Sequence, residues 1–461
     1  VLDMNNFDRL ISINLQNCET LNFSALNDIK LPIKKAEIWR GELENFIKNK
    51  NFSQKDFENA SVECEAGIAL GTINYVLEVA EIEIPVDTGA VWVGGGMSAG
   101  AAVANASHGT YGLLYGKASD LVLEVNSING NGEFLCEKRE VKPKNFNENE
   151  AMINSAKAQY GESAIGTQGT FAVIYQLKFA TKKLPKFRHY FLLKLDGISN
   201  LYKIRQVLRN NFARNLLQFE IMDNLSLKII KNFEAENFVN PFFDETGKPF
   251  SSEAEIDSKF LLMLQIIGDE NDDYIGFAAY DFLNKNLGFS ENNIAYSGSD
   301  SNESGEEFAK MRHSISGAST KYANSFGKAN LNRVSLDLAV PIKHLEAFVN
   351  EIYSKINSQN LEGAVFGHIG IGAIHLHIFN KEKEINPSWK QEITEEIFSI
   401  TKKYNGSCWS EHGIGTANAS LYKKFTQEEY YQEWLSYKKK HDPNNILSPR
   451  NNGFDKELYN T

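Results

Sequence analysis

Residues 367–378 have the sequence GHIGIGAIHLHI, and three of the nine histidines of the 461-residue chain lie in this one segment. His368 and His375 are separated by two glycines, which allow backbone conformations and close approaches that a side chain would block. Neutral imidazoles are common ligands of zinc-class cations. On a strand, His375 and His377 would point to the same face. The segment therefore predicts a polar site that could bind a metal.

A second polar segment follows further along the chain, where Glu411 and His412 are adjacent and flanked by glycines. Imidazoles with one carboxylate form the usual ligand set of a divalent cation that keeps an open position for substrate. Such a cation could polarise a hydroxyl or carboxylate oxygen. A lone histidine is more often a satisfied polar group than a ligand, so the prediction depends on the clustering of these residues, and it is weakest for His377.

The composition narrows the class of protein. A net charge of −11 and a pI near 5.5 argue against nucleic acid as the main partner. We find no apolar run of about 18 residues that could span a bilayer, and no signal peptide at the start of the sequence. The four cysteines are scattered, with no C-x-x-C pair for an iron–sulfur cluster or a redox dithiol. We expect a cytoplasmic protein, with peripheral association at the inner membrane as an alternative.

The chain is long enough for two or three domains. Short apolar runs punctuated by glycine, with the hairpin signal Asn129-Gly130, indicate an α/β or α+β domain before residue 180. Residues 189–195 (HYFLLKL) favour a strand, whereas residues 201–217 and 387–404 have helical spacing. The polar, acidic residues 297–307 predict a mobile surface loop. The predicted division is 1–182, a middle cap domain 183–360, and a C-terminal segment 361–461 that returns to the interface between them.

Three motifs, in the same order, resemble one known family. GHIGIGAIHLH is similar to G-H-x-G-D-G-N-x-H, SEHGIG to E-H-G-[IV]-G, and DPNNILSPRN to a D-P-x-x-x-L-N-P ending. That family contains D-lactate dehydrogenase, the glycolate oxidase catalytic subunit and D-2-hydroxyglutarate dehydrogenase, which are flavoproteins of the vanillyl-alcohol-oxidase fold. The resemblance implies an α+β fold: a two-subdomain FAD-binding domain and an α+β cap domain with an antiparallel sheet.

The resemblance also implies roles for individual residues. The family's metal ligands correspond to His368, His375 and Glu411, for zinc, manganese or iron, with His375 also beside the substrate. Its catalytic base corresponds to His412, which would take the hydroxyl proton while hydride leaves for flavin N5. MRHSIS followed by RVSLDLAVP is similar to the family's substrate-binding segment. Arg312 would therefore clamp the substrate carboxylate through a bidentate pair, beside Ser316.

The FAD-binding half is similar over three segments: VECEAGIALGTINYVL, the stretch from IPVDTG to LVLEV, and GESAIGTQGTFAVI. Runs of glycine and alanine let backbone N–H groups approach the pyrophosphate and the isoalloxazine edge. The implied flavin contacts are Pro85, Thr88, Gly95, Gly96, Asn105, Ser107, Gly116, Gly166, Thr170 and Val173.

The sequence departs from the family pattern in several places. The family's first glycine-rich loop, R-G-G-G-T-G, does not precede Val1, so we expect either an incomplete sequence or poor flavin binding. Ile371 and Ala373 replace an aspartate and an asparagine of the metal motif, which should weaken the orientation of the ligands. A lysine that often helps to bind the substrate is replaced near Ser335, and residues 11–60 look inserted or rearranged. His108 stands where the family has glycine, and we expect no covalent flavin link there.

The leading hypothesis is an FAD-dependent dehydrogenase that oxidises a D-2-hydroxy acid of the lactate, glycolate or 2-hydroxyglutarate type. Electrons would leave to a separate acceptor: a quinone, an electron-transfer flavoprotein or an iron–sulfur subunit. A second hypothesis keeps the flavin but changes the substrate to another alcohol or a sugar acid. A third is a degenerate, non-catalytic subunit of an oxidase complex. The sequence leaves the oligomeric state open, a homodimer included.

Overall fold

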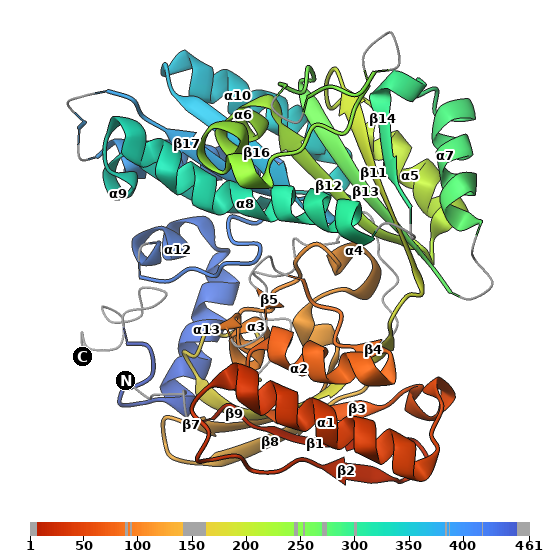
Figure 1. Ribbon diagram of the computed structural model, residues 1–461. Helices are drawn as coiled ribbons and strands as arrows, with labels where there is room; N and C mark the ends of the chain where they lie inside the picture. The colour runs from red at the N-terminus through yellow and green to blue at the C-terminus, as the bar shows by residue number, and fades with distance from the viewer. Residues whose placement is uncertain are drawn as a thin grey trace.

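The protein has two lobes, which Figure 1 shows one above the other in a computed structural model. The N-terminal lobe comprises residues 7–183 and the cap lobe residues 187–403. A C-terminal arm, residues 404–449, runs from the cap lobe back along the N-terminal lobe. The structure describes residues 7–87, 91–92, 95–141, 163–243, 248–251, 254–269, 274–298, 302–382, 385–386, 388–416 and 418–449.

The N-terminal lobe is built on a six-stranded sheet of order β2-β1-β3-β9-β7-β8, in which every neighbouring pair is antiparallel. The helices of the lobe contribute buried apolar residues, Trp39 and Leu43 of α1 among them, to one core with the strands. The elements are β1 Leu10–Asn14, β2 Thr20–Asn22, α1 Pro32–Lys50, β3 Ser61–Glu65, α2 Leu70–Leu77, β4 Ile82–Glu83, β5 Val91–Trp92, β6 Gly95–Gly96, α3 Ala99–Ala104, α4 Gly112–Tyr115, β7 Val122–Asn129, β8 Phe134–Lys138, β9 Ala172–Ala180 and β10 Lys182–Lys183.

The helix α1 shows how the stretch interpreted as inserted becomes part of this core. Pro32 stands at its first turn, where proline removes no hydrogen bond, and Asn51 ends it in the left-handed conformation with φ 53°. Trp39 and Leu43, four residues apart on one face, are fully buried. Residues 11–60 thus form β1, β2 and α1 as an integral layer of the N-terminal lobe.

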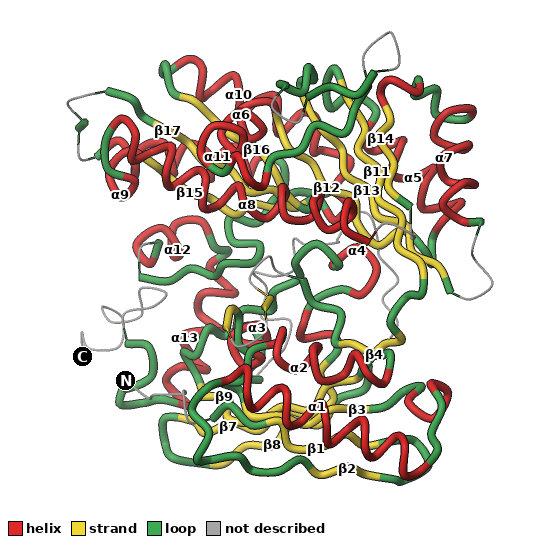
Figure 2. Tube along the Cα trace, in the orientation of Figure 1, coloured by secondary structure: helices red, strands yellow, loops and turns green. Residues whose placement is uncertain are grey.

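The cap lobe contains a seven-stranded sheet of order β14-β11-β13-β12-β16-β17-β15, and all its pairs are antiparallel, as predicted. Helices cover both faces, so every residue of β12, β13 and β17 is buried (Figure 2). The elements are β11 Phe187–Leu195, α5 Leu201–Phe212, β12 Leu216–Asp223, α6 Asn224–Phe233, β13 Phe260–Gly268, α7 Ile275–Lys285, β14 Ile294–Ser297, α8 Asn302–Phe326, α9 Ala329–Asn332, β15 Arg333–Ala339, α10 Leu345–Ser358, β16 Glu362–Gly367, β17 Ala373–Phe379 and α11 Trp389–Lys403.

Several local predictions can be compared with these elements. The hairpin at Asn129-Gly130, the strand at 189–195, and the helices within 201–217 and 387–404 are confirmed. The loop predicted at 297–307 is wrong, because α8 begins at Asn302. Its acidic residues lie near a helix N-terminus, where negative charge is favourable, and one pairs with a lysine four residues on.

The C-terminal arm contains α12 (Ala419–Phe425) and α13 (Glu428–His441). On α13, the Lys438 ammonium is fully buried, pairs with Asp442, and donates to the Thr170 carbonyl at 2.9 Å. The Gly130 N–H donates to the His441 carbonyl at 2.7 Å. These bonds fasten the arm to the N-terminal lobe. No helix among the described residues is long and apolar enough to cross a membrane.

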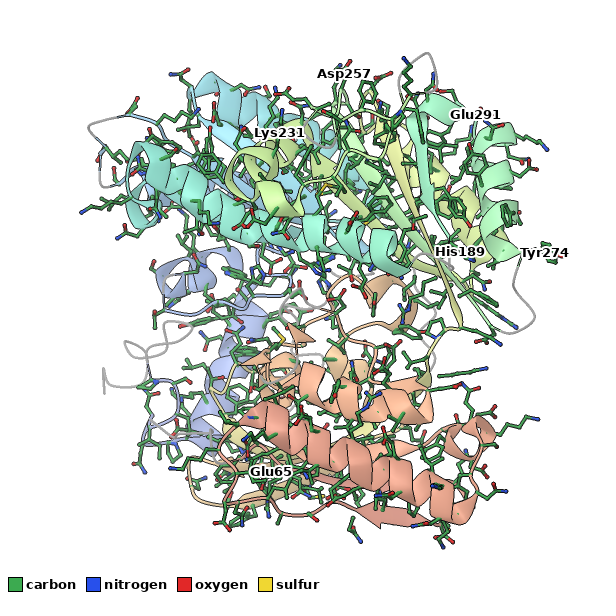
Figure 3. All side chains as sticks on the ribbon, in the orientation of Figure 1. Glu65, His189, Lys231, Asp257, Tyr274 and Glu291 are labelled. Atoms are coloured by element: carbon green, nitrogen blue, oxygen red, sulfur yellow. The ribbon has the colours of Figure 1, made fainter. Side chains whose placement is uncertain are left out.

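Side chains also meet where the lobes join. In Figure 3 the label His189 marks β11, the first strand of the cap lobe, and the label Glu65 marks β3 of the N-terminal lobe. Near this junction Arg188 lies 3.5 Å from Glu83 and donates to the Tyr111 hydroxyl at 3.3 Å. Since Glu83 and Tyr111 belong to the N-terminal lobe, these contacts help to fix the cap lobe over it.

Candidate active site

The first two candidate metal ligands lie on the hairpin of β16 and β17. His368 directly follows β16, and His375 lies in β17 opposite Phe366. Gly367, the last residue of β16, has φ 130°, and a Cβ at this position would lie 3.1 Å from the His375 backbone nitrogen. Only glycine allows this approach of the two strands. The turn thereby brings both imidazoles to one place.

Glu411 of the C-terminal arm completes a triangle of ligand atoms. His368 Nε2 is 3.3 Å from His375 Nε2 and 3.4 Å from Glu411 Oε2, and the third side, His375 Nε2 to Glu411 Oε2, is 3.9 Å. Two ligand atoms at about 2.1 Å from a tetrahedral cation lie about 3.4 Å apart. The three side chains, all buried, therefore fit a zinc-class cation in spacing and in donor chemistry.

A carboxylate lies near the Nδ1 atom of each imidazole, on the side of the ring away from the triangle. Glu220 Oε1 is 2.8 Å from His368 Nδ1, and Asp337, opposite His375 in the strand register, is 3.6 Å from His375 Nδ1. Metal-binding histidines usually donate their second ring N–H to such a group. The prediction that Ile371 weakens the orientation of the ligands is therefore wrong for His368, because Glu220 in another strand provides that bond.

The Glu411 side chain is oriented from the N-terminal lobe. The backbone N–H groups of His108 and Gly109 donate to Glu411 Oε1 at 3.0 and 2.6 Å. Asp337 Oδ2 accepts the backbone N–H groups of Glu411 and His412. As Oε1 is held by the backbone, Oε2 is left to face the two imidazoles. The His108 ring, edge-on to His368, is buried as a structural neighbour of the site.

The charges in this cluster are strongly coupled. Burial opposes protonation of His368, but the carboxylates of Glu220 and Glu411 outweigh it and raise the pKa of His368 to about 10. Burial would raise the pKa of Glu411, but His108 and His368 hold it well below its usual range. Burial, together with His412, lowers the pKa of His375 well below its ordinary value. Two ionised carboxylates thus flank the position where a cation would bind.

A cavity of about 200 Å³ opens beside the triangle, and its walls include Arg312, Ser316, His368, His375, Glu411 and His412. The exposed His412 ring stacks on His375, with centroids 4.9 Å apart. We call this the histidine cavity. It brings together every catalytic, substrate-binding and metal-binding residue named from the sequence. His377 also lines it, and burial lowers the pKa of His377 to about 3, so its ring is neutral.

Arg312 does not stand alone in this cavity. Its Nε and Nη2 atoms lie 3.1 and 2.9 Å from Glu220 Oε2. That edge of the guanidinium is occupied, so a substrate carboxylate would have to use the end that carries Nη1. Nη1 has no hydrogen bond to another residue that the structure describes. Along this edge both nitrogens contact a single oxygen of the protein's own Glu220, so the bidentate clamp predicted for the substrate stays a prediction for the other end of the guanidinium.

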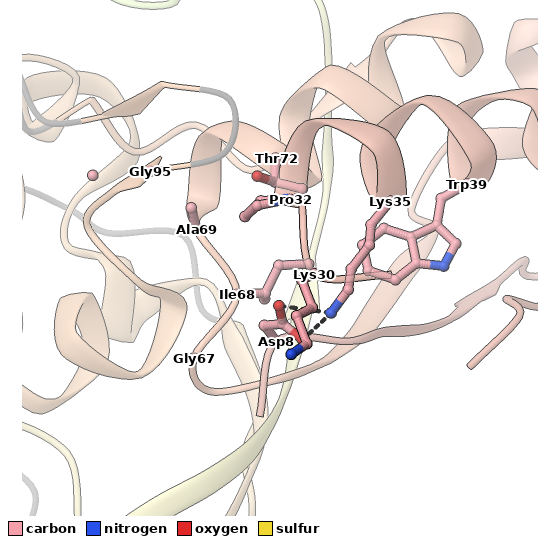
Figure 4. A pocket seen from close by; sticks show the side chains of 11 residues that line it. Asp8, Lys30, Pro32, Lys35, Trp39, Gly67, Ile68, Ala69, Thr72 and Gly95 are labelled. Carbon is pink, nitrogen blue, oxygen red and sulfur yellow. Dashed lines mark hydrogen bonds and ion pairs between the residues drawn. The ribbon is translucent and has the colours of Figure 1, made fainter. Parts of the chain in front are cut away.

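The candidate flavin contacts fall at two other places. Gly95 and Gly96 line a cavity of about 350 Å³ (Figure 4), which we call the glycine cavity. In it Lys35 pairs with Asp8 at 2.6 Å. Asn105 and Gly166 line a narrow cleft that reaches Glu411. The remaining candidates described by the structure, which line none of these cavities, are Pro85, Ser107, Gly116, Thr170 and Val173; Thr88 lies outside the described residues.

The fit to a flavin rests on two observations. The Ser107 hydroxyl is buried and has no hydrogen-bond partner among the described residues. Gly166 and Gly413, which both line the narrow cleft, have φ of 69° and 78°, a conformation that L side chains rarely adopt. An orphan hydroxyl and a cleft edged by such glycines suit a planar, polar-edged ligand.

Two residues of the site were missed from the sequence, Glu220 and Asp337. Glu220 lies between apolar residues of β12, a strand that is buried on both faces. A charged residue in such a strand needs a partner, and this was the signal in the sequence that could have pointed to it. Asp337 belongs to the quoted segment RVSLDLAVP but received no role. Their partners come from other strands, which local patterns do not reveal.

The cap lobe and the whole C-terminal arm match a known family model. It is described as "FAD linked oxidases, C-terminal domain", and it covers residues 184–452. The chain belongs to the FAD-linked oxidase family. The matched region contains all three members of the ligand triangle, together with Arg312 and His412.

Curated relatives of the chain are dehydrogenases by name. A probable mitochondrial D-2-hydroxyglutarate dehydrogenase of Oryza sativa subsp. japonica is 25% identical over 406 residues, covering 86% of this chain and 64% of the relative. The mitochondrial D-2-hydroxyglutarate dehydrogenase of Arabidopsis thaliana is 26% identical, covering 84% and 62%. A D-lactate dehydrogenase [cytochrome] of the same plant is 22% identical, covering 85% and 62%. This chain thus spans less than two thirds of their length.

A solved structure shows the same fold. The alkyldihydroxyacetonephosphate synthase structure matches with a TM-score of 0.52 and 13% identity, covering 85% of this chain and 64% of that one. The predicted α+β fold class and the family resemblance are confirmed.

Proposed function

We propose that this protein is an FAD-dependent dehydrogenase that oxidises a D-2-hydroxy acid to the 2-oxo acid, with a divalent cation on His368, His375 and Glu411. One observation carries the proposal. The triangle of ligand atoms opens into the same cavity as an exposed imidazole, His412, and a guanidinium, Arg312. The names of the relatives point to the same substrate class.

The protein's own residues divide the work of binding and proton transfer. Arg312, through its Nη1 end, and Ser316 bind the substrate carboxylate. A cation on the triangle would polarise the substrate hydroxyl. His412 takes the hydroxyl proton, and its stacking on His375 and its hydrogen-bonded backbone hold the ring at the cavity.

FAD would supply the acceptor for the hydride that leaves the substrate α-carbon, which balances the two electrons of the oxidation. Gly166 and Gly413 would hold it at the cleft beside Glu411. The neutral His377 and the buried His375 keep further positive charge away from the reacting centre. The reduced flavin would then pass its electrons to a separate acceptor.

The test is an anaerobic spectrum of the purified, flavin-loaded protein. D-lactate, glycolate and D-2-hydroxyglutarate are added in turn, with His412→Ala and, as a control away from the cavity, His344→Ala. We expect one acid to bleach the flavin band of the wild type and of His344→Ala, but not of His412→Ala. A flavin that none of the acids bleaches would favour another alcohol or a sugar acid. A colourless protein that FAD does not reconstitute would favour a non-catalytic subunit.

A further inference from the structure

Glu220 places one carboxylate between two parts of the active site. Its Oε1 is 2.8 Å from Nδ1 of His368, and its Oε2 is 2.9 and 3.1 Å from Nη2 and Nε of Arg312. The Glu220 side chain is almost completely buried, at 2% exposure. Each of its oxygens therefore has one partner, and the two partners belong to different functions of the cavity.

The sheet brings Glu220 to this position. The next residue, Ile221, pairs with Gly367, the residue before His368. The Arg312 side chain reaches the same carboxylate from α8, which packs on that face of the sheet. The arrangement depends on strand pairing and helix packing, both of which are fixed by surrounding apolar residues.

Stability alone does not account for a carboxylate here. Burying an ion pair is costly, and apolar residues of similar volume are often at least as stable in such a place. The residues next to Glu220 in β12, which are Phe219, Ile221 and Met222, are all apolar and buried. The charge at Glu220 is best explained by its effect on its two partners.

The effect on each partner follows from the geometry. With the proposed cation in place of the second ring proton, a His368 that donates its Nδ1–H to Glu220 turns Nε2 toward the position that faces Glu411 and His375. An Arg312 whose Nε–Nη2 edge is held by Glu220 can offer only its Nη1 end to the cavity. Both side chains are thus held in one orientation by the same group.

We propose that Glu220 is a positioning residue that couples the two halves of the site: it orients His368 for the metal and Arg312 for the substrate carboxylate. The proposal rests on the metal and hydroxy-acid assignment made above. It predicts that loss of the Glu220 charge weakens metal binding and substrate binding together.

The first measurement is zinc affinity of the flavin-loaded protein, by competition with a chromophoric chelator, which needs no turnover. We expect Glu220→Gln to weaken zinc binding by about 10- to 100-fold, the range for residues that orient a ligand. The control is Asp223→Asn on the same strand, a buried acid that caps α6 and touches neither His368 nor Arg312. Asparagine caps a helix as well as aspartate does, so zinc affinity should stay within about twofold of the wild type.

The second measurement separates metal from substrate. Glu220→Gln should raise the KM for the hydroxy acid and weaken zinc binding, whereas Arg312→Lys should raise KM and leave zinc binding unchanged. In the double variant the effects on KM should be less than additive, because both changes remove one interaction. Glu220→Asp, which keeps the charge but cannot reach both partners, should show a smaller loss of zinc affinity and serves if the glutamine variant does not fold.

Zinc affinity unchanged in both Glu220→Gln and Glu220→Asp would overturn the proposal. Equal weakening in Asp223→Asn would also overturn it, since it would show a general effect of disturbing β12. A protein that oxidises none of the acids, yet loses zinc affinity in Glu220→Gln alone, would reject the hydroxy-acid function and retain the role of Glu220 at the metal.

Discussion

The histidine cavity and the glycine cavity are lined by different kinds of residue. Around the histidine cavity, charged side chains converge and each is held by another group, as His368 is by Glu220 and Glu411 by two backbone N–H groups. The wall of the glycine cavity includes Gly67, Gly95 and Gly96 beside the Lys35–Asp8 pair. We therefore expect binding at the histidine cavity to be lost when a charged side chain is neutralised. Binding at the glycine cavity should weaken when a substitution adds volume.

The largest effect should come from the buried Lys438, which fastens the C-terminal arm to the N-terminal lobe. Lys438→Met leaves the buried Asp442 carboxylate without its cation, which costs about 3–5 kcal/mol. Thermal unfolding of the variant should show this loss. The exposed neighbour serves as the control, and Lys439→Met should stay within about 0.5 kcal/mol of the wild type. Equal stability of the two variants would mean that the arm is not fastened by Lys438.

The next effect tests the charge of the histidine cavity. Glu411→Gln removes the anionic corner of the triangle, so zinc content and turnover should fall by more than the roughly 10- to 100-fold expected for a residue that only orients a ligand. Zinc is measured after desalting, and turnover by dye reduction. Glu428→Gln, an exposed change at the start of α13, should alter neither. A Glu411→Gln protein with full zinc content would exclude this triangle as the metal site.

Added volume should disturb the N-terminal lobe to a lesser degree. A Cβ on Gly100 of α3 would lie 2.7 Å from the Ala66 Cβ, next to Gly67 in the wall of the glycine cavity. Gly100→Ala should therefore destabilise the protein by about 1–3 kcal/mol and weaken FAD binding, measured by fluorescence titration. Zinc affinity should not change. A loss of zinc affinity in this variant would show that the two regions are not independent.

A matched glycine should behave in the opposite way. Gly41 lies inside α1, and a Cβ there would meet no atom within 4 Å. Gly41→Ala should stabilise the protein by about 0.5–1 kcal/mol, because alanine loses less conformational entropy in a helix. Thermal unfolding measures this gain. A destabilised variant would mean that α1 is not the helix described.

The smallest effect concerns the reactivity of the buried thiols. Cys64 of the N-terminal lobe and Cys408 of the C-terminal arm should behave alike. Burial raises the pKa of Cys408 to about 12 and that of Cys64 further still, so neither thiol ionises near neutral pH. A thiol reagent should modify only the exposed Cys18 and Cys136 in the native protein. Modification of Cys64 or Cys408 before unfolding would reveal local opening of the lobe that contains it.

The sequence predicted the parts of the site that depend on short-range patterns. One glycine turn joins His368 and His375, and Glu411 and His412 are neighbours in the chain. Each pair could therefore be recognised from the sequence alone. Their meeting with Arg312 followed only from the family resemblance. Glu220 could not be found in this way, because its role depends on the pairing of β12 with β16, strands that are far apart in the chain.

Two other predictions failed for a similar reason. The orientation of His368 was expected to suffer from Ile371 beside it, but the compensating carboxylate comes from another strand. The acidic residues before Arg312 were interpreted as a loop, although such residues also suit a helix N-terminus. The division predicted at residue 360 stays a prediction; β15 and β16, on its two sides, are both strands of the cap sheet.

The bonds from His108 and Gly109 to Glu411 have a consequence for how the protein matures. The third corner of the triangle is oriented by backbone groups of the opposite lobe, so it has its final geometry only after the lobes and the C-terminal arm have docked. The cation proposed for this site would therefore be acquired late by a newly made chain, as one of the last steps of biogenesis. Tight metal binding would then report that assembly is complete.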